Sequence, residues 1–134
     1  AVQVISTTKA PGAVGLFQAI KAGDFLFASG QIAIDPEKGK VVAGTVVGQA
    51  EQCMKNVGAI LEEAGSATIM RQETVYLTDI NFFGAVNEVY GKYFQKTLPA
   101  RSCVEISHLP KDVFVEVEVI VTAGNKTLFR TVEK

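Results

Sequence analysis

Apolar and polar residues alternate along this chain with two different periods, and each period predicts a different kind of element. From Val46 to Ala64, apolar side chains recur at three- and four-residue steps, with Glu, Gln and Lys between them. This is the pattern of an amphipathic helix of about five turns. Thr45 can cap the start of this helix, and Gly65 can adopt the left-handed conformation just beyond its end.

A second helical pattern runs from Phe82 to Phe94, where aromatic residues and valines share one face. Asn81 is the expected cap at its start, because short polar side chains satisfy the first free N–H groups of a helix. Pro99 ends the segment, since proline disfavours helical backbone in the residue before it. The chain is therefore expected to hold two helices.

Period-two patterns predict the strands. The most regular one places valines at every odd position from Val113 to Val121, while Glu116 and Glu118 lie on the opposite side with Phe114 and Ile120. The segments expected to be strands are 2–6, 25–34, 72–78, 101–106 and 113–122. Their order with the two helices predicts an α+β fold, in which both helices pack on one face of a mixed sheet.

Length and composition indicate one domain over residues 1–134. Hydrophobic residues make up 48% of the chain and charged residues 20%, which is typical of a globular protein. A domain of this size buries roughly 70% of its unfolded surface. We therefore expect part of the apolar surplus to cover another subunit.

The charges and cysteines narrow the class of protein. A formal net charge of −1 provides no field for capturing phosphates, so nucleic-acid binding is disfavoured. The uncharged stretches are far shorter than the roughly 20 apolar residues of a membrane span, so no membrane association is expected. No secretory signal is visible, and Cys53 and Cys103 match no metal or redox spacing. A reducing compartment, the cytoplasm, is expected, or an organelle if a presequence was removed.

Arg101 and one of the two glutamates Glu116 and Glu118 are the residues whose types best fit catalysis. Arg101 opens a strand, where its planar guanidinium can hold a carboxylate through two hydrogen bonds, although a solvated surface arginine is the more common case. Glu116 shares its face with apolar neighbours and with Glu118. A carboxyl group half-covered in this way has a raised pKa and can act as a general acid or base. A simple water-facing strand explains two glutamates about equally well.

Other motifs point less clearly to chemistry. The Ser29-Gly30-Gln31 segment interrupts an apolar strand, which indicates either a site wall or a β-bulge. Cys103 and His108 suggest a thiol nucleophile, but their odd spacing would place them on opposite faces of a continuing strand. With one histidine and two distant cysteines, a zinc site is not expected, and the glycines form no phosphate-binding loop. We expect no metal and no cofactor.

At these residues the sequence closely resembles the Rid family of reactive-intermediate deaminases, also called the YjgF family, and specifically its RidA branch. The resemblance covers essentially the whole chain. It is carried by KAPGAVG, FASGQIAID, AEQCMKNVGAILEEAG, VYLTDINFFGAVNEVYGKYF and, above all, PARSCVEISHLPKDVFVEVEVI, which looks like the family signature.

The resemblance implies a chorismate-mutase-like fold that assembles as a homotrimer with clefts between neighbouring subunits. It also implies hydrolysis of 2-imino acids, such as 2-iminopropanoate and 2-iminobutanoate, to 2-oxo acids and ammonia. These imines are released by dehydratases that depend on pyridoxal phosphate. By position, Arg101 would clamp the substrate carboxylate with the backbone amide of Cys103, and Glu116 would orient the attacking water or handle its proton. The walls of the cleft would include Ser29, Gly30 and Asn87.

One segment departs from the family pattern. RidA proteins typically read close to AIGPYSQAI, whereas residues 13–20 here read AVGLFQAI and are one residue shorter. Phe17 stands near the family's active-site tyrosine; it keeps an apolar wall but cannot donate a phenolic hydrogen bond. Two alternative functions therefore stay open: a non-catalytic trimer that binds small carboxylates or partner proteins, and an RNA-cleaving translation inhibitor.

Overall fold

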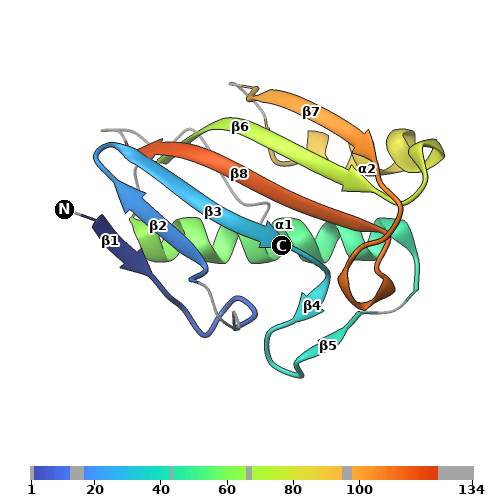
Figure 1. Ribbon diagram of the computed structural model, residues 1–134, viewed down its shortest axis with the longest axis horizontal. Coiled ribbons are helices and arrows are strands. Elements are labelled where there is room, and N and C mark those ends of the chain that lie inside the picture. Colours follow the sequence, from blue (N-terminus) through green and yellow to red (C-terminus); the bar gives the residue numbers. More distant parts are fainter. Residues whose placement is uncertain (1, 13–16, 43, 66–67, 95–97, 124–134) are drawn as a thin grey trace.

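The computed structural model describes residues 2–12, 17–42, 44–65, 68–94 and 98–123. A six-stranded mixed sheet forms one layer, and helices α1 and α2 cover one of its faces (Figure 1). This confirms the predicted α+β fold. Neighbouring strands are antiparallel except β6 and β7, which are parallel. In sheet order the strands are β1 (Val2–Ile5), β2 (Ala19–Ala22), β3 (Phe25–Gln31), β8 (Val115–Ala123), β6 (Thr68–Leu77) and β7 (Ala100–Glu105).

Helix α1 (Val46–Ala64) has the predicted bounds. Thr45 caps it, because its hydroxyl accepts a hydrogen bond from the Gly48 N–H at 3.1 Å. Gly65 follows the helix with φ 128° and ψ 165°, so its φ is positive as expected. Its ψ, however, is extended, so the left-handed helical conformation expected at Gly65 is not the one found.

Helix α2 (Phe83–Gly91) is shorter than the predicted helix, and its expected cap is wrong. A 3-10 turn over Ile80–Phe82 precedes α2, and Asp79 caps this turn by accepting a hydrogen bond from the Asn81 N–H at 2.9 Å. Asn81 thus lies inside the turn. The carboxylate two residues earlier reaches the free N–H group first, so the chain begins to wind before Asn81.

The expected strand over residues 25–34 divides at a β-bulge. Strand β3 ends at Gln31, and its register against β8 shifts between Ala28 and Gln31. The remaining residues turn away from the sheet into a small hairpin of β4 (Ile34–Asp35) and β5 (Lys40–Val41). Strand β2, which the sequence analysis did not predict, pairs with both β1 and β3.

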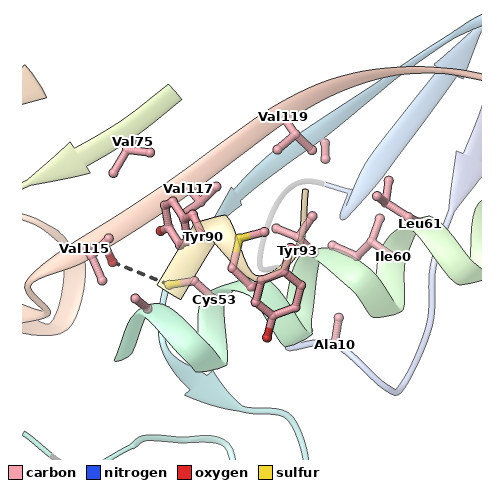
Figure 2. Close-up of a cluster of buried hydrophobic side chains, with 14 of the residues drawn as sticks. Ala10, Cys53, Ile60, Leu61, Val75, Tyr90, Tyr93, Val115, Val117 and Val119 are labelled. Carbon is pink, nitrogen blue, oxygen red and sulfur yellow. Dashed lines mark hydrogen bonds between the residues drawn. The ribbon is translucent and has the colours of Figure 1, made fainter. Parts of the chain in front are cut away.

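The core lies between the sheet and the helices, as Figure 2 shows. Val115, Val117, Val119 and Val121 of β8 are each at most 2% exposed, which confirms the predicted apolar face. They pack with apolar residues of α1 and α2 such as Met54, Val57, Ile60, Val86 and Val89. Each buried valine of this kind contributes about 1.5–3 kcal/mol to folding.

The opposite face of the sheet has no covering helix among the described residues. Phe25 and Phe27 of β3 are each 47% exposed, and their ring centroids lie 6.2 Å apart. Ile120 of β8 is the register partner of Phe27, and Glu116 and Glu118 follow on the same side. We call this surface the open face. None of the helices in the described ranges is long and apolar enough to cross a membrane.

Asn56 fixes the β4–β5 hairpin to α1, and its loss is expected to destabilise the fold. Its buried amide donates to the carbonyl oxygens of Ile32, at 3.1 Å, and Ile34, at 3.0 Å. Replacing it by alanine leaves both acceptors without this donor. We expect Asn56→Ala to lower the free energy of unfolding by about 2 kcal/mol, measured by urea denaturation at one protein concentration.

Lys55→Ala is the matched control, because Lys55 is the exposed neighbour on the same helix. It should change the free energy of unfolding by less than about 0.5 kcal/mol. Equal stabilities of the two variants would show that the hydrogen bonds of the Asn56 side-chain amide do not stabilise the hairpin.

Candidate functional site

Gly30 and Glu116 approach each other closely at the bulge between β3 and β8. A Cβ atom at Gly30 would lie 2.8 Å from the carboxyl carbon of Glu116 and would overlap one of its oxygens. A side chain at this position would therefore force the Glu116 carboxylate to move, whereas glycine lets it lie close to the β3 backbone. The register shift between Ala28 and Gln31 confirms the β-bulge interpretation of the Ser29-Gly30-Gln31 segment, and its role as a site wall stays a prediction.

Ser29 connects Phe17 to the same site. The Ser29 hydroxyl donates to the Phe17 carbonyl oxygen at 2.6 Å, and the Ser29 N–H donates to the Gln18 carbonyl oxygen at 2.9 Å. The buried Gln18 amide also donates to the carbonyl groups of three residues in the segment before it, Thr7, Ala10 and Pro11. The Phe17 side chain is left 55% exposed beside this anchored backbone. Phe17, Ser29, Gly30 and Glu116 form what we call the Glu116 cluster.

The environment of Glu116 favours its neutral form. Glu116 is half-buried, and its pKa is raised first by burial and second by the negative charge of Glu118. Tyr76 of β6 donates a hydrogen bond from its phenol to Glu118. This bond raises the pKa of Tyr76 and keeps the phenol protonated. A carboxyl group whose pKa is raised toward neutrality can both accept and return a proton.

Arg101 belongs to a second group of residues at the other edge of the sheet. It lies on β7 with its guanidinium 5.2 Å from the ring centroid of Phe83 on α2, a cation–π distance. Asn87 is exposed one helical turn beyond Phe83. Cys103 follows two residues after Arg101 on the same side of β7, as the alternation predicted. Phe83, Asn87, Arg101 and Cys103 form what we call the Arg101 cluster.

Cys103 and His108 do not have the properties of a nucleophilic pair. Burial raises the pKa of the Cys103 thiol, and the opposing charge of Arg101 only partly offsets this. The thiol is therefore protonated at neutral pH. Strand β7 ends at Glu105, and His108 is exposed in the loop that follows. Within the described ranges, no three His, Cys, Asp or Glu side chains are grouped as metal ligands.

The two clusters lie on opposite faces of the sheet. Arg101 is the register partner of Glu73, which in turn pairs with Val119 on the helix-covered face, whereas Glu116 lies on the open face. Arg101 and Glu116 are also two strands apart across the sheet, and their positions differ by three residues along the strands. Each of these separations is about 10 Å. A single chain therefore does not bring Arg101 and Glu116 together.

Sequence reasoning did not single out Glu73, Tyr76 or Tyr90. Tyr76 shares the open face with Glu118, and Tyr90 is buried on α2. Glu73 is 1% exposed on β6. Its position was readable from the pattern QETVYLT, because Glu73 alternates in step with Val75 and Leu77 and so occupies an apolar face. Residues 13–16 of the shortened segment lie outside the described residues.

The coupling between Glu118 and Glu116 can be measured directly. Glu118→Gln removes a negative charge that disfavours ionisation of Glu116, so the pKa of Glu116 is expected to fall. Carbon-13 NMR titration of the glutamate carboxyl groups measures it. Glu62→Gln, which removes an exposed charge from α1, should leave the pKa of Glu116 unchanged. The same pKa in all three proteins would disprove the coupling.

Comparisons with known proteins place the chain in a family. The profile of the family described as Endoribonuclease L-PSP matches residues 7–123. A RutC family protein of Pyrococcus abyssi is 51% identical over 120 residues, covering 88% of this chain and 94% of that protein. The 2-iminobutanoate/2-iminopropanoate deaminase of Rattus norvegicus is 46% identical over 124 residues, covering 91% of this chain and 90% of the rat protein.

Solved structures give the same result. The Rid family protein YyfA of Yersinia pestis superposes with a TM-score of 0.87 and 42% identity, over 92% of this chain and all of that one. E. coli TdcF, solved with bound serine, has a TM-score of 0.85 and 41% identity, over 91% of this chain and 99% of its own. With the profile match and these identities over nearly the whole length, the chain belongs to the Rid family, also called the YjgF family.

Proposed function

We propose that this chain is a 2-imino acid deaminase that hydrolyses 2-iminopropanoate and 2-iminobutanoate to 2-oxo acids and ammonia. The observation that carries the proposal is the presence of two kinds of group: an exposed guanidinium over an aromatic ring, and a half-buried carboxyl group that lies close against Gly30. The first suits a carboxylate ligand, and the second suits proton transfer. The deaminase names of several relatives support the same reaction.

The Arg101 cluster would hold the substrate. Arg101 donates two parallel hydrogen bonds to the substrate carboxylate, assisted by the backbone amide of Cys103 on the same edge strand. Phe83 limits the orientations of the guanidinium from one side. Asn87 provides a polar contact one turn further along α2. These contacts fix the imine carbon relative to the attacking water, and such positioning is a large part of catalysis for an electrophile that is already reactive.

Glu116 would move the protons. As water attacks the imine carbon, the C–O bond forms, and the Glu116 carboxylate takes a proton from the water and gives it to the imine nitrogen, which becomes the amine of a carbinolamine. The carbinolamine then collapses: Glu116 takes the hydroxyl proton and gives it to the amine nitrogen, the C–N bond breaks and ammonia leaves. One imine and one water thus give one 2-oxo acid and one ammonia, and Glu116 ends as the carboxylate with which it began. A pKa raised toward neutrality lets one carboxyl group serve both steps.

The complete site would form between copies of this chain. Because the Arg101 and Glu116 clusters lie on opposite faces, the substrate can contact both only where two chains meet. The open face offers the contact surface, since Phe25 and Phe27 leave a large apolar area in water. We therefore propose a homotrimer with three equivalent clefts, each formed by the Arg101 cluster of one subunit and the Glu116 cluster of its neighbour. Glu116 points toward the open side that the next subunit would cover.

A mixing experiment tests the shared site. Arg101→Ala and Glu116→Gln are each expected to lower the rate of 2-iminobutanoate hydrolysis at least about 100-fold, in a coupled assay with a dehydratase that generates the imine. When the two variants are unfolded together in equal amounts and refolded, about a quarter of the clefts would combine an intact Arg101 with an intact Glu116. Activity should recover to that fraction of wild type.

Refolding each variant alone is the control and should restore nothing. Mixed trimers without recovered activity would disprove the shared cleft. Arg101→Ala with full activity would disprove the clamp. Binding of 2-oxobutanoate without any turnover by the wild type would instead support the non-catalytic carboxylate-binding alternative.

Phe17 supplies an apolar wall to the Glu116 cluster but no hydrogen bond. Phe17→Tyr adds a phenol beside Ser29 and Glu116, where it can donate to the attacking water or to the substrate. One additional hydrogen bond made in the transition state is worth about 1.5 kcal/mol, so kcat/KM is expected to rise roughly tenfold in the imine-hydrolysis assay. Phe25→Tyr, further along the open face, is the control for added polarity. A Phe17→Tyr rate at or below wild type would show that the missing phenol does not limit this protein.

A further inference from the structure

Glu73 is the one charged side chain among the buried residues that the structure describes. It is 1% exposed, and its Oε2 atom has no hydrogen-bond partner in the described part of the chain. Other buried polar side chains, such as Gln18 and Asn56, bond to backbone carbonyl groups. An unsatisfied buried carboxyl group costs several kcal/mol if it is ionised, so the site of Glu73 calls for an explanation beyond packing.

The parallel register of β6 and β7 places Glu73 directly beside Arg101, on the same side of the sheet. Arg101 is also the charge that acts on the Glu73 carboxyl group. Nevertheless, no ion pair within 4.0 Å joins them in the described ranges, because the guanidinium lies over Phe83. Glu73 therefore has an available cationic neighbour with which it does not pair in this conformation.

The other groups around Glu73 supply no competing positive charge. Tyr90 on α2 is buried close enough for the Glu73 charge to raise its pKa, and its hydroxyl is the second buried polar atom without a partner in the described residues. Cys103 on β7 is also affected by the Glu73 charge, and Cys53 on α1 acts on Tyr90; both are thiols and neither carries a positive charge. The described side chains of strand β8 on this face are Val115, Val117, Val119 and Val121. Arg101 is thus the one nearby described side chain that can stabilise an ionised Glu73.

The charge of Glu73 changes within the physiological range of pH. Burial raises the pKa of Glu73 to about 7, although the guanidinium of Arg101 opposes the shift. Below that pH, the carboxyl group is neutral and has no need of a counter-charge. Above it, the carboxylate is stabilised chiefly by Arg101.

We propose that Glu73 is a positioning residue that sets how firmly Arg101 holds the substrate carboxylate: the neutral acid leaves the guanidinium free over Phe83, and the carboxylate competes for it. This inference rests on the proposed role of Arg101 as the carboxylate clamp. The substrate carboxylate and ionised Glu73 are both attracted to the single positive charge of Arg101. Each of these anions therefore weakens the interaction of the other with Arg101.

This competition determines whether the affinity for the substrate rises or falls with pH. A bound substrate carboxylate disfavours ionisation of Glu73 and so raises its pKa further. Binding therefore takes up a proton near pH 7, and by linkage the affinity falls as the pH rises through this range. A shift of about one pKa unit on binding corresponds to about a tenfold loss of affinity between the acidic and the alkaline limit.

The probe is 2-oxobutanoate, because its carboxylate stays ionised throughout the range and it does not react. We expect its Kd for the wild type to rise about tenfold between about pH 5.5 and about pH 8.5. Glu73→Gln, the isosteric mimic of the neutral acid, should lose the part of this rise that ionisation of Glu73 causes, so that its Kd at about pH 8.5 stays well below that of the wild type. Glu88→Gln, which removes an exposed charge from α2, should follow the wild type. In the imine-hydrolysis assay, the same pH dependence should appear in KM and not in kcat.

A second measurement needs no variant. Carbon-13 NMR of the Glu73 carboxyl group in the wild type should show a higher pKa with 2-oxobutanoate bound than without it. An unchanged pKa, or a Kd with the same pH profile in Glu73→Gln and wild type, would overturn the role of Glu73 while leaving the clamp intact. By contrast, if Arg101→Ala binds 2-oxobutanoate as tightly as the wild type, the proposed function itself fails, and the role of Glu73 fails with it.

Discussion

The strict alternation of strand β8 is the constraint on which the rest of the structure depends. Its four buried valines commit one face of the central strand to helices α1 and α2. The same backbone then has to present Glu116 and Glu118 on the other side, because successive side chains of a strand point in opposite directions. Both helices pack against the valine face. The division between a packed face and an open face therefore follows from one nine-residue strand, and it assigns each candidate site residue to a side.

The sequence predicts the packed face and the open face well where a periodic segment is long. Helix α1 and strand β8 are strongly periodic: α1 has its predicted bounds, and β8 keeps the predicted alternation but begins at Val115, after a 3-10 turn, and not at Val113. Strand β2 was missed because its four residues, Ala19–Ala22, carry too little pattern to predict a strand without its partners. The cap of the second helical segment was misplaced because Asp79 and Asn81 both suit that position, and only the backbone path decides between them.

The candidate site was predictable residue by residue but not as an arrangement. The residue types indicate chemistry at Arg101 and at one of Glu116 and Glu118, and the glycine at position 30 indicates a close approach. The family resemblance selects Glu116 from the two glutamates. That Arg101 and Glu116 lie on opposite faces depends on the register of β6 against β7 and β8, which no single strand pattern contains. The position of Glu73 could likewise be predicted from the sequence only in part. Its place on an apolar face is visible in the sequence, but its neighbour Arg101 becomes apparent only when the parallel pair is formed.

The separation of the two clusters has a chemical consequence for the proposed reaction. If Arg101 and Glu116 were neighbours in one chain, they would form an ion pair, which would lower the pKa of Glu116 and occupy the guanidinium. Placed on opposite faces, each keeps the state that catalysis needs: a carboxyl group with a raised pKa and an uncommitted cation. In the proposed cleft, the substrate would lie between them, with its carboxylate on the cation and its imine carbon toward the acid. Glu73 is the acid that does lie beside Arg101, and its burial keeps it neutral up to about pH 7, so that it too leaves the cation available.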